Sequence, residues 1–536
     1  MTLKRIILSI LTLIVVLLMG GSLISSIRQP QVGNQLQLYQ TDLLVQASEW
    51  DGSGLPEDEV QQFRQAAFGK DALESAIGQY QEVRTASATG LARLQQRMAT
   101  LQLTSDEQIQ QIAASVKQQQ QLINQIDLQS GMVWAQQGKV SKAVETWQKL
   151  AASTSQKLSM VDKATSITAA TLVDLWQDPP TVRPETAAIL NDNLKGWFRY
   201  RALEQLYAVE NQPEQLIQLQ ATEREVAERT LIKLSITSIL PSLGGLLGTA
   251  GLIALIGQRL LRGKASILAV PEGQWEVPWN WEVIWQVIVG GFLFVGQVVL
   301  PLLGQVVLPL IARPGLTPAV GAATLPTSGF AFMASFADLA LTSRGKAIYS
   351  LIFYLLMAAA TLGVLYGSIR TYLPLSKEWF RVKLVDKWPL WGFGSYLIAL
   401  PLMLGVSLLN QQIWQGQGGN NPLLQLVLEE RDPLSLGLFL FTAAVAAPVF
   451  EEILFRGFLL PSLTRYMPIW GAIGLSSLIF SVAHLSFSEV LPLTVLGAIL
   501  GFAYVRSRNL LSSILLHSAW NSVTMIGLFV LGSGGS

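Results

Sequence analysis

The chain has only two histidines, His484 and His517, and both lie in apolar stretches near the C-terminus. Two adjacent carboxylates, Glu451 and Glu452, interrupt another apolar stretch of the same region. Ionisable groups in such surroundings are costly to bury and often mark a functional site. The chain contains no cysteine, which excludes thiol nucleophiles and Cys-ligated metals. These residues predict acid–base chemistry in which the nucleophile is water, a hydroxyl group, a carboxylate or an amine.

Glu451, Glu452 and Arg456 fall within one predicted membrane-spanning helix, residues 434–463. An ionised side chain at the centre of a bilayer costs roughly 2.5 to 3.5 kcal/mol on insertion scales. Glu452 and Arg456 are four residues apart, so they share a helix face and can neutralise each other as an ion pair. Glu451 is rotated about 100° from Glu452 around the helix axis, so we expect it to be unpaired. We expect Glu451 to point into a polar cavity.

Two further residue pairs have the four-residue spacing that places side chains on one helix face. Phe480 and His484 form one pair, and His517 and Asn521 form the other. A single buried histidine is more often a structural residue than a ligand. Because the rest of the predicted membrane region has no histidine and few acidic residues, the sequence favours one shared site. Its predicted members are Glu451, His484, His517 and Asn521.

Three short motifs carry a family resemblance: Glu451-Glu452-x-x-x-Arg456, Phe480-x-x-x-His484 and His517-x-x-x-Asn521. In this order they resemble the motifs of the CPBP family of intramembrane proteases. That family includes CAAX prenyl endopeptidases of the Rce1 type and bacterial Abi proteins. The resemblance covers the chain from about residue 388 onward, and the N-terminal half has no counterpart in the family.

The resemblance implies a hydrolytic role for each residue of the predicted site. Glu451 would be the general base that takes a proton from water, and His484 would share that water or a metal. His517 and Asn521 would stabilise the oxyanion, directly or by holding a metal. Glu452, Arg456 and Phe480 would surround these groups, with the ion pair positioning Glu451.

Two alternatives stay open for a metal cofactor. His484, His517 and Glu451 together would be a ligand set that suits Zn²⁺. Asparagine is an uncommon zinc ligand, however, and the family has members described as metalloenzymes and members described as metal-independent glutamate proteases. The expected cofactor is therefore either a zinc ion or none.

The composition of the chain places the predicted site in a membrane. Of 536 residues, 50% are hydrophobic and only 14% are charged, outside the usual range of soluble domains. A net charge of +1 argues against a nucleic-acid partner, because phosphate is normally met by a basic face. We predict an all-α, polytopic membrane protein with about nine transmembrane helices. The predicted spans are 1–27, 231–256, 282–312, 346–368, 388–408, 434–463, 469–487, 489–505 and 509–531.

Residues 1–27 combine a basic start with an apolar run that is long enough to cross a bilayer. A signal peptide and an uncleaved anchor both fit, and the lack of a clear A-x-A cleavage site favours the anchor. In the nine-helix arrangement the basic loops alternate, which places residues 28–230 on the extracytoplasmic side. The expected location is a bacterial plasma membrane or a thylakoid-type membrane.

Residues 28–230 are polar and glutamine-rich, with apolar residues at helical spacing. Gly131, Trp134, Gly138 and Trp147 have the spacing of a tetratricopeptide-like (TPR-like) hairpin, and an irregular helical bundle is an equal alternative. The predicted domains are an anchor at 1–27, a soluble helical domain at 28–230, membrane helices at 231–387 and a protease core at 388–536.

The predicted function is an intramembrane endopeptidase that hydrolyses a peptide bond of a membrane-associated protein or peptide. Its expected partners are that substrate, the lipid bilayer and a protein bound by residues 28–230. The alternative is a non-proteolytic membrane scaffold or assembly factor. Such a protein would keep the buried polar residues for stability and would recruit proteins through its helical domain.

Overall fold

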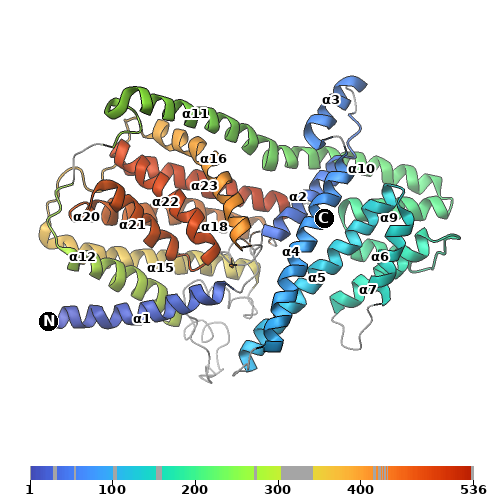
Figure 1. The fold of residues 1–536 in the computed structure, drawn as a ribbon, viewed down its shortest axis with the longest axis horizontal. Coiled ribbons are helices and arrows are strands. Elements are labelled where there is room, and N and C mark those ends of the chain that lie inside the picture. The colour runs from blue at the N-terminus through green and yellow to red at the C-terminus, as the bar shows by residue number, and fades with distance from the viewer. Residues whose placement is uncertain are drawn as a thin grey trace. The chain divides into compact units, whose positions relative to one another are not determined.

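The structure, a computed structural model, is all-helical in the part of the chain that it describes. The fold class predicted from the sequence, an all-α polytopic membrane protein, is confirmed. Figure 1 shows the helices in chain order. The described residues are 2–27, 33–52, 56–69, 71–100, 106–152, 160–270, 275–303, 342–414, 418–419, 424, 427, 430 and 432–532.

Eight helices within the described ranges are long and apolar enough to cross a bilayer. Each corresponds to one of the nine predicted spans, and the end of the predicted span 282–312 lies outside the described residues. The eight helices are Leu3–Ser26, Pro213–Ala265, Trp281–Leu303, Ser343–Tyr372, Trp388–Trp414, Pro433–Leu463, Phe487–Ser507 and Leu510–Leu531.

The remaining predicted span, 469–487, is shorter than expected. Helix α21 (Ile469–Val482) has 14 residues, or about 21 Å at 1.5 Å per residue, against about 30 Å for a hydrocarbon core. The helix ends in a turn, and Leu485 has a positive φ of 59°, a conformation that a right-handed helix does not contain. His484 therefore lies in this turn, whereas the sequence had predicted that it lies on the helix.

The chain divides into two compact units. The membrane unit consists of residues 1–31 and 241–529, and the helical unit consists of residues 32–240 and 530–536. The longer elements of the membrane unit are α1 (Leu3–Ser26), α11 (Leu240–Arg262), α12 (Trp281–Trp285), η3 (Gln286–Val299), α15 (Ser343–Ile369), α16 (Trp388–Trp414), α18 (Pro433–Phe441), η6 (Thr442–Ala446), α19 (Ala447–Glu452), η7 (Ile453–Leu459), α20 (Leu460–Leu463), α21, α22 (Phe487–Ser507) and α23 (Leu510–Gly532). Those of the helical unit are α2 (Gly33–Ala47), α3 (Glu57–Phe68), α4 (Ala72–Thr100), α5 (Asp106–Gln136), α6 (Val140–Ala152), α7 (Met160–Trp176), α8 (Thr186–Asn193), α9 (Gly196–Val209), α10 (Pro213–Leu234) and η1 (Ser235–Ile239).

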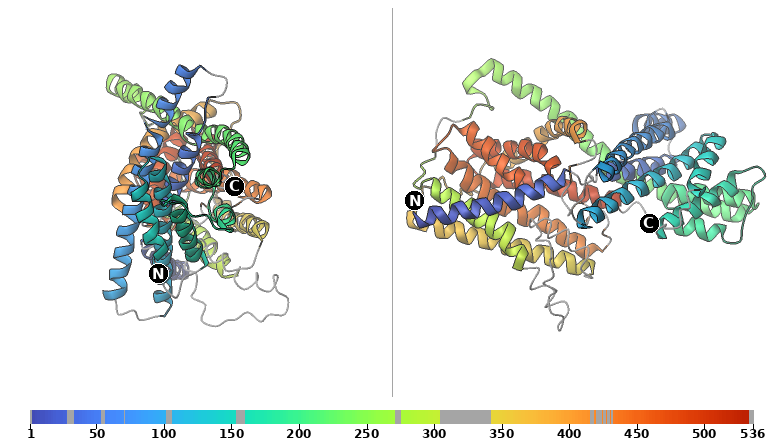
Figure 2. Two further views of the ribbon diagram at one scale, coloured as in Figure 1. Left: turned by 90° about the vertical axis from the view of Figure 1, so that its right-hand side faces the viewer. Right: turned by 60° about the horizontal axis from the view of Figure 1, so that its bottom comes forward.

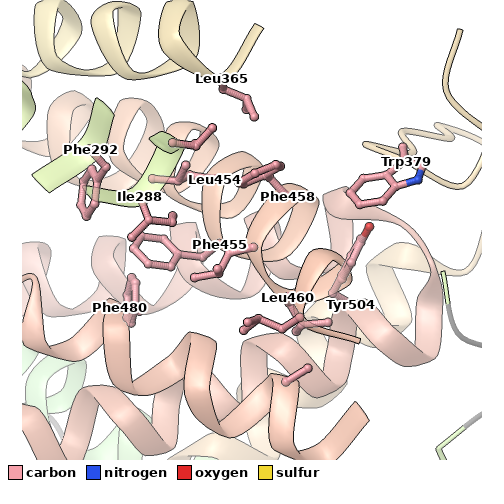
Figure 3. Packing of buried hydrophobic residues seen from close by; sticks show 14 of the residues in the cluster. Ile288, Phe292, Leu365, Trp379, Leu454, Phe455, Phe458, Leu460, Phe480 and Tyr504 are labelled. Carbon is pink, nitrogen blue, oxygen red and sulfur yellow. The ribbon is translucent and has the colours of Figure 1, made fainter. Parts of the chain in front are cut away.

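An apolar cluster fills the centre of the membrane unit. Phe292 of η3 meets Phe455 of η7 edge to face at a centroid distance of 5.5 Å, and Phe455 meets Phe480 of α21 similarly at 5.3 Å. Figure 3 shows these rings together with Leu454 and Phe458. All five side chains are buried, so their close packing fixes η7 and α21 against η3.

The N-terminal helix α1 packs along η3 within the membrane unit (Figures 1 and 2). Near the start of α1, Arg5 forms an ion pair with Glu282. At its end, Ser26 Oγ accepts a hydrogen bond from the backbone N–H of Phe487 at 3.0 Å. Helix α1 therefore contacts the start of α22, next to the turn that carries His484.

In the helical unit, α5 and α6 form the hairpin that the sequence predicted. Gly138 has a positive φ of 77° at the turn between them. A Cβ added to Gly131 would lie 2.2 Å from Trp147 Nε1, so a glycine is needed for the two helices to approach. The Trp147 indole N–H donates to the Leu128 carbonyl at 3.1 Å. A TPR-like architecture for the whole unit stays a prediction.

Candidate active site

The span that carries the paired glutamates contains two π-helical stretches, η6 and η7. In η6 the backbone N–H of Ala447 donates to the carbonyl of Thr442, five residues back. In this register the next carbonyl, that of Ala443, would need a donor at Pro448, which has no N–H. The side-chain amide of Asn521 supplies the bond, donating from Nδ2 to the Ala443 carbonyl at 2.7 Å. Pro448 thus leaves open the acceptor that positions Asn521.

Glu452 and Arg456 form the ion pair that their spacing predicted. Arg456 Nη1 donates to Glu452 Oε1 at 2.7 Å, and the two side chains are only 1% and 0% exposed. Arg456 Nη2 donates to the backbone carbonyl of Gly497 at 3.1 Å. The pair therefore neutralises two buried charges and links η7 to α22.

Glu452 also orients His517. The Nδ1 atom of His517 lies 2.9 Å from Glu452 Oε1, and an ionised carboxylate can only accept, so Nδ1 carries the proton. The other ring nitrogen, Nε2, lies 3.8 Å from Glu451 Oε2. That distance is too long for a direct hydrogen bond, so the two atoms face each other across a narrow gap. The Glu452 carboxylate thereby fixes the side of the ring that His517 presents to Glu451.

Phe480 lies at the centre of this charged group. Its ring meets the rings of His484 and His517 edge to face at centroid distances of 4.9 and 5.8 Å. The Arg456 guanidinium carbon lies 4.7 Å from the centroid of the same ring, within the range of a cation–π contact. Phe480 therefore restrains both imidazoles and separates His484 from the Glu452 ion pair.

His484 is held by the turn that ends α21. Its Nδ1 atom lies 2.9 Å from the Phe480 carbonyl oxygen, which can only accept, so this nitrogen also carries a proton. In the neutral ring Nε2 is then the acceptor nitrogen. The four-residue spacing of Phe480 and His484 still brings them together, although the second residue lies beyond the helix.

One cavity of about 220 Å³ brings the predicted residues together. Glu451, His484, His517 and Asn521 all line it, and Glu451 retains 14% of its side-chain exposure. Most of the other lining side chains are apolar, among them Phe353, Met357, Leu493, Leu496 and Met525. The arrangement has the form of a small polar site in an apolar wall, in which a carboxylate and two imidazoles can exchange protons with a bound molecule.

Glu451 has a partner that the sequence did not reveal. The Tyr354 hydroxyl, from α15, donates to Glu451 Oε1 at 2.8 Å, so the expectation that Glu451 has no partner is wrong. The sequence of α15 contains three tyrosines, and no pattern selects one of them. The best available signal is the spacing of Ser350 and Tyr354, which places two polar side chains on one helix face, and both line the cavity.

The described residues do not include three His, Asp or Glu side chains placed together as metal ligands. Glu451 Oε2 and His517 Nε2 are 3.8 Å apart, but His484 does not complete a set with them. In this arrangement the predicted ligands do not fit a zinc site with three protein ligands. Zinc binding stays a prediction from the family resemblance.

Comparison with known proteins identifies the same part of the chain. Residues 433–523 match the family model of type II CAAX prenyl endopeptidases, described as Rce1-like. The chain is 27% identical over 186 residues to the membrane-embedded CAAX protease MroQ of Staphylococcus aureus. The aligned residues cover 33% of this chain and 73% of that protein. It is 25% identical over 137 residues to YdiL of Bacillus subtilis, a protein with a provisional assignment as a membrane peptidase. This alignment covers 26% of the chain and 55% of YdiL. No solved structure matches the chain.

The matched segment runs from the start of α18 into α23 and contains all seven residues of the three motifs. Helices α1 and α15 lie outside the matched segment. They carry Ser26, which bonds the start of α22, and Tyr354, which bonds Glu451. The resemblance recognised in the sequence is confirmed for this segment. The C-terminal part of this multi-pass membrane protein is an Rce1-like CAAX protease domain.

Proposed function

We propose that the chain is an intramembrane endopeptidase in which Glu451 activates water for attack on a peptide bond. The observation that carries the proposal is the single cavity shared by Glu451, His484, His517 and Asn521. The family match supports proteolysis in general terms.

In the first step Glu451 accepts a proton from a water molecule through Oε2, the oxygen that faces His517. The water oxygen forms a bond to the carbonyl carbon of the substrate, and the carbonyl oxygen becomes an oxyanion. His484 carries its proton on Nδ1, so its Nε2 can accept the second hydrogen of the water and orient it.

Charge balance suggests how the oxyanion is stabilised. Glu451 and Glu452 together bear two negative charges, and Arg456 supplies one positive charge, in surroundings where an uncompensated charge is costly. The net charge of these three side chains is balanced when His517 holds one further proton. His517 can then donate from Nε2 as well as from Nδ1. Asn521 has a second amide hydrogen beyond the one that the Ala443 carbonyl accepts. His517 and Asn521 are therefore the proposed oxyanion donors.

In the second step the carbon–nitrogen bond breaks and the oxyanion re-forms a carbonyl group. Glu451 gives its proton to the leaving nitrogen, which becomes an amine, and the other product is a carboxylic acid that loses its proton to solvent. The Glu451 carboxylate is restored, so the same residue serves as general base and then as general acid.

We also propose where the chain acts. The alternation of basic loops supports an orientation in which the helical unit is extracytoplasmic, in a bacterial plasma membrane or a thylakoid-type membrane. There the helical unit would dock a membrane-associated substrate or a partner protein. A substrate with a prenylated CAAX terminus is no part of this proposal.

The proposal is tested by quantitative proteomics of peptide ends in membranes that contain either the wild-type chain or Glu451→Gln. We expect a set of new peptide ends that depends on the wild-type protein. Glu378→Gln is the matched control, because Glu378 is an exposed carboxylate outside the cavity. Identical peptide ends with wild type and Glu451→Gln, at equal protein levels, would favour the scaffold function instead.

A further inference from the structure

Helix α15 forms one wall of the cavity, although it lies outside the segment that matches the protease family. Ser350, Tyr354 and Met357 of this helix all line the cavity, at the spacing that places side chains on a single helix face. Within this wall the Tyr354 hydroxyl is the group that reaches the proposed base, at 2.8 Å from Glu451 Oε1.

The position of Tyr354 is fixed by packing. Its ring meets Phe450 edge to face at a centroid distance of 6.0 Å, and Phe450 directly precedes Glu451 in the chain. Phe450 is only 2% exposed and also contacts Phe292 of the central apolar cluster, at 6.1 Å. The hydroxyl and the carboxylate are thus held by neighbouring residues of one rigid cluster.

The two oxygens of Glu451 therefore have different surroundings. Oε1 accepts the Tyr354 hydroxyl hydrogen, whereas Oε2 faces His517 Nε2 across the 3.8 Å gap. A carboxylate that is bonded at one oxygen cannot rotate freely around its last side-chain bond. The oxygen left to remove a proton from water is consequently Oε2, the one that faces His517.

We propose that Tyr354 is a positioning residue that completes the site from outside the family domain, by holding Glu451 so that Oε2 is the reactive oxygen. The inference rests on the proposed function for its catalytic consequence, but the contact itself can be tested without any substrate. The variant Tyr354→Phe keeps the ring and its contact with Phe450 and removes only the hydroxyl group.

The test uses the full-length protein in lipid nanodiscs and a hydrophobic carbodiimide, a reagent that couples to carboxyl groups. Mass spectrometry measures the labelling rates of Glu451 and of Glu489, which lines the same cavity and serves as an internal control. In Tyr354→Phe we expect faster labelling of Glu451, because Oε1 is no longer covered by the hydroxyl, and an unchanged rate at Glu489. The control variant Tyr366→Phe, which alters an exposed tyrosine of the same helix, should change neither rate.

The same variants are then compared for peptide-end production in membranes. Loss of a hydrogen bond to a charged group predicts a decrease of about tenfold or more for Tyr354→Phe, with no change for Tyr366→Phe. Unchanged Glu451 labelling together with unchanged cleavage would overturn the role of Tyr354 and leave the proposed function intact. If the wild-type chain forms no new peptide ends, the proposed function fails, whereas faster labelling of Glu451 in Tyr354→Phe would still support the positioning contact.

Discussion

Each unit of the molecule contains a tyrosine hydroxyl bonded to a carboxylate, and the two pairs differ in what surrounds the second oxygen. In the helical unit, Tyr80 donates to Asp42 Oδ1 at 2.6 Å, and Gln129 Nε2 donates to Oδ2 at 3.1 Å. In the membrane unit, Tyr354 donates to Glu451 Oε1, whereas Oε2 faces His517 Nε2 at 3.8 Å, and Glu451 and His517 both line the cavity. The first carboxylate has both oxygens occupied by the protein, and the second keeps one for a reacting molecule.

A tyrosine–carboxylate bond therefore does not by itself indicate a catalytic site. Both histidines of the chain are in the membrane unit, so no imidazole is available in the helical unit to share a proton with Asp42. A cavity and a neighbouring proton carrier distinguish the two pairs. Variants that alter one pair and leave the other intact separate their roles.

The largest effect is expected from removing the group that faces the second oxygen. His517→Ala should reduce peptide-end production by about 10²- to 10⁴-fold, because it removes a proton carrier and oxyanion donor. The equivalent change in the helical unit, Gln129→Ala, should leave cleavage unchanged at equal protein levels. Peptide-end proteomics of membranes measures both, and equal losses in the two variants would remove the distinction between the pairs.

An intermediate effect is expected from Tyr80→Phe. It leaves Asp42 without one of its donors and should lower the free energy of unfolding of the helical unit by about 1 to 3 kcal/mol. Hydrogen exchange of the full-length protein in nanodiscs should then be faster in α2 and α4, with normal cleavage. Tyr354→Phe should instead reduce cleavage and leave hydrogen exchange in the helical unit unchanged. Equal exchange responses of the helical unit to the two variants would contradict the comparison.

A pH dependence of the helical unit is expected from Asp42. Burial raises the pKa of this carboxyl to about 6 from an ordinary value of 3.8, so the folded unit binds the proton more tightly than the unfolded chain. Its contribution to stability is therefore full below about pH 4 and is lost as the pH rises through about 6. Exchange in α2, corrected for the intrinsic pH dependence of the exchange rate, should slow as the pH falls from about 8 to about 5. Asp42→Asn should reduce this change, because burial also raises the pKa of Glu223, a second carboxyl of the helical unit, to about 7. Asp42→Asn combined with Glu223→Gln should remove the change, and a slope that persists in this double variant would assign it to another group.

The smallest effect is expected from Ser26→Ala. Ser26 Oγ accepts from the first backbone N–H of α22, and a comparable helix cap contributes about 0.5 to 2 kcal/mol. We expect a loss of cleavage of a few fold, because the turn that carries His484 immediately precedes this position. Ser25→Ala is the matched control, since Ser25 Oγ bonds a carbonyl of its own helix. If the two variants behave alike, α1 does not support the site.

The sequence predicted the motif residues because helical spacing determines which side chains share a face. Glu452 and Arg456, four residues apart, illustrate this, and their ion pair is present. Tyr354 could not be predicted, because its role depends on which spans are neighbours in the bundle. The turn at His484 was missed for another reason, since an apolar composition does not reveal the positive φ of Leu485 that follows the end of α21.

The pairing of Asn521 with the Ala443 carbonyl shows the same limit more sharply. Pro448 is visible in the sequence, and the loss of one backbone donor follows from it directly. Which carbonyl is left open depends on the π-helical register of η6, and which side chain satisfies it depends on the packing of α23. Sequence spacing predicts local faces, whereas contacts between distant helices require the structure.

Peptide hydrolysis by water that Glu451 activates is tested most directly by following the oxygen atom of that water. Membranes that contain the chain are incubated in water enriched in ¹⁸O, and mass spectrometry reads the isotope in newly formed C-terminal carboxylates. We predict that the wild-type chain and Asp42→Asn produce new C-termini that carry ¹⁸O, and that Glu451→Gln does not. New termini that carry ¹⁸O to the same extent with Glu451→Gln, or none with the wild-type chain, would contradict the account.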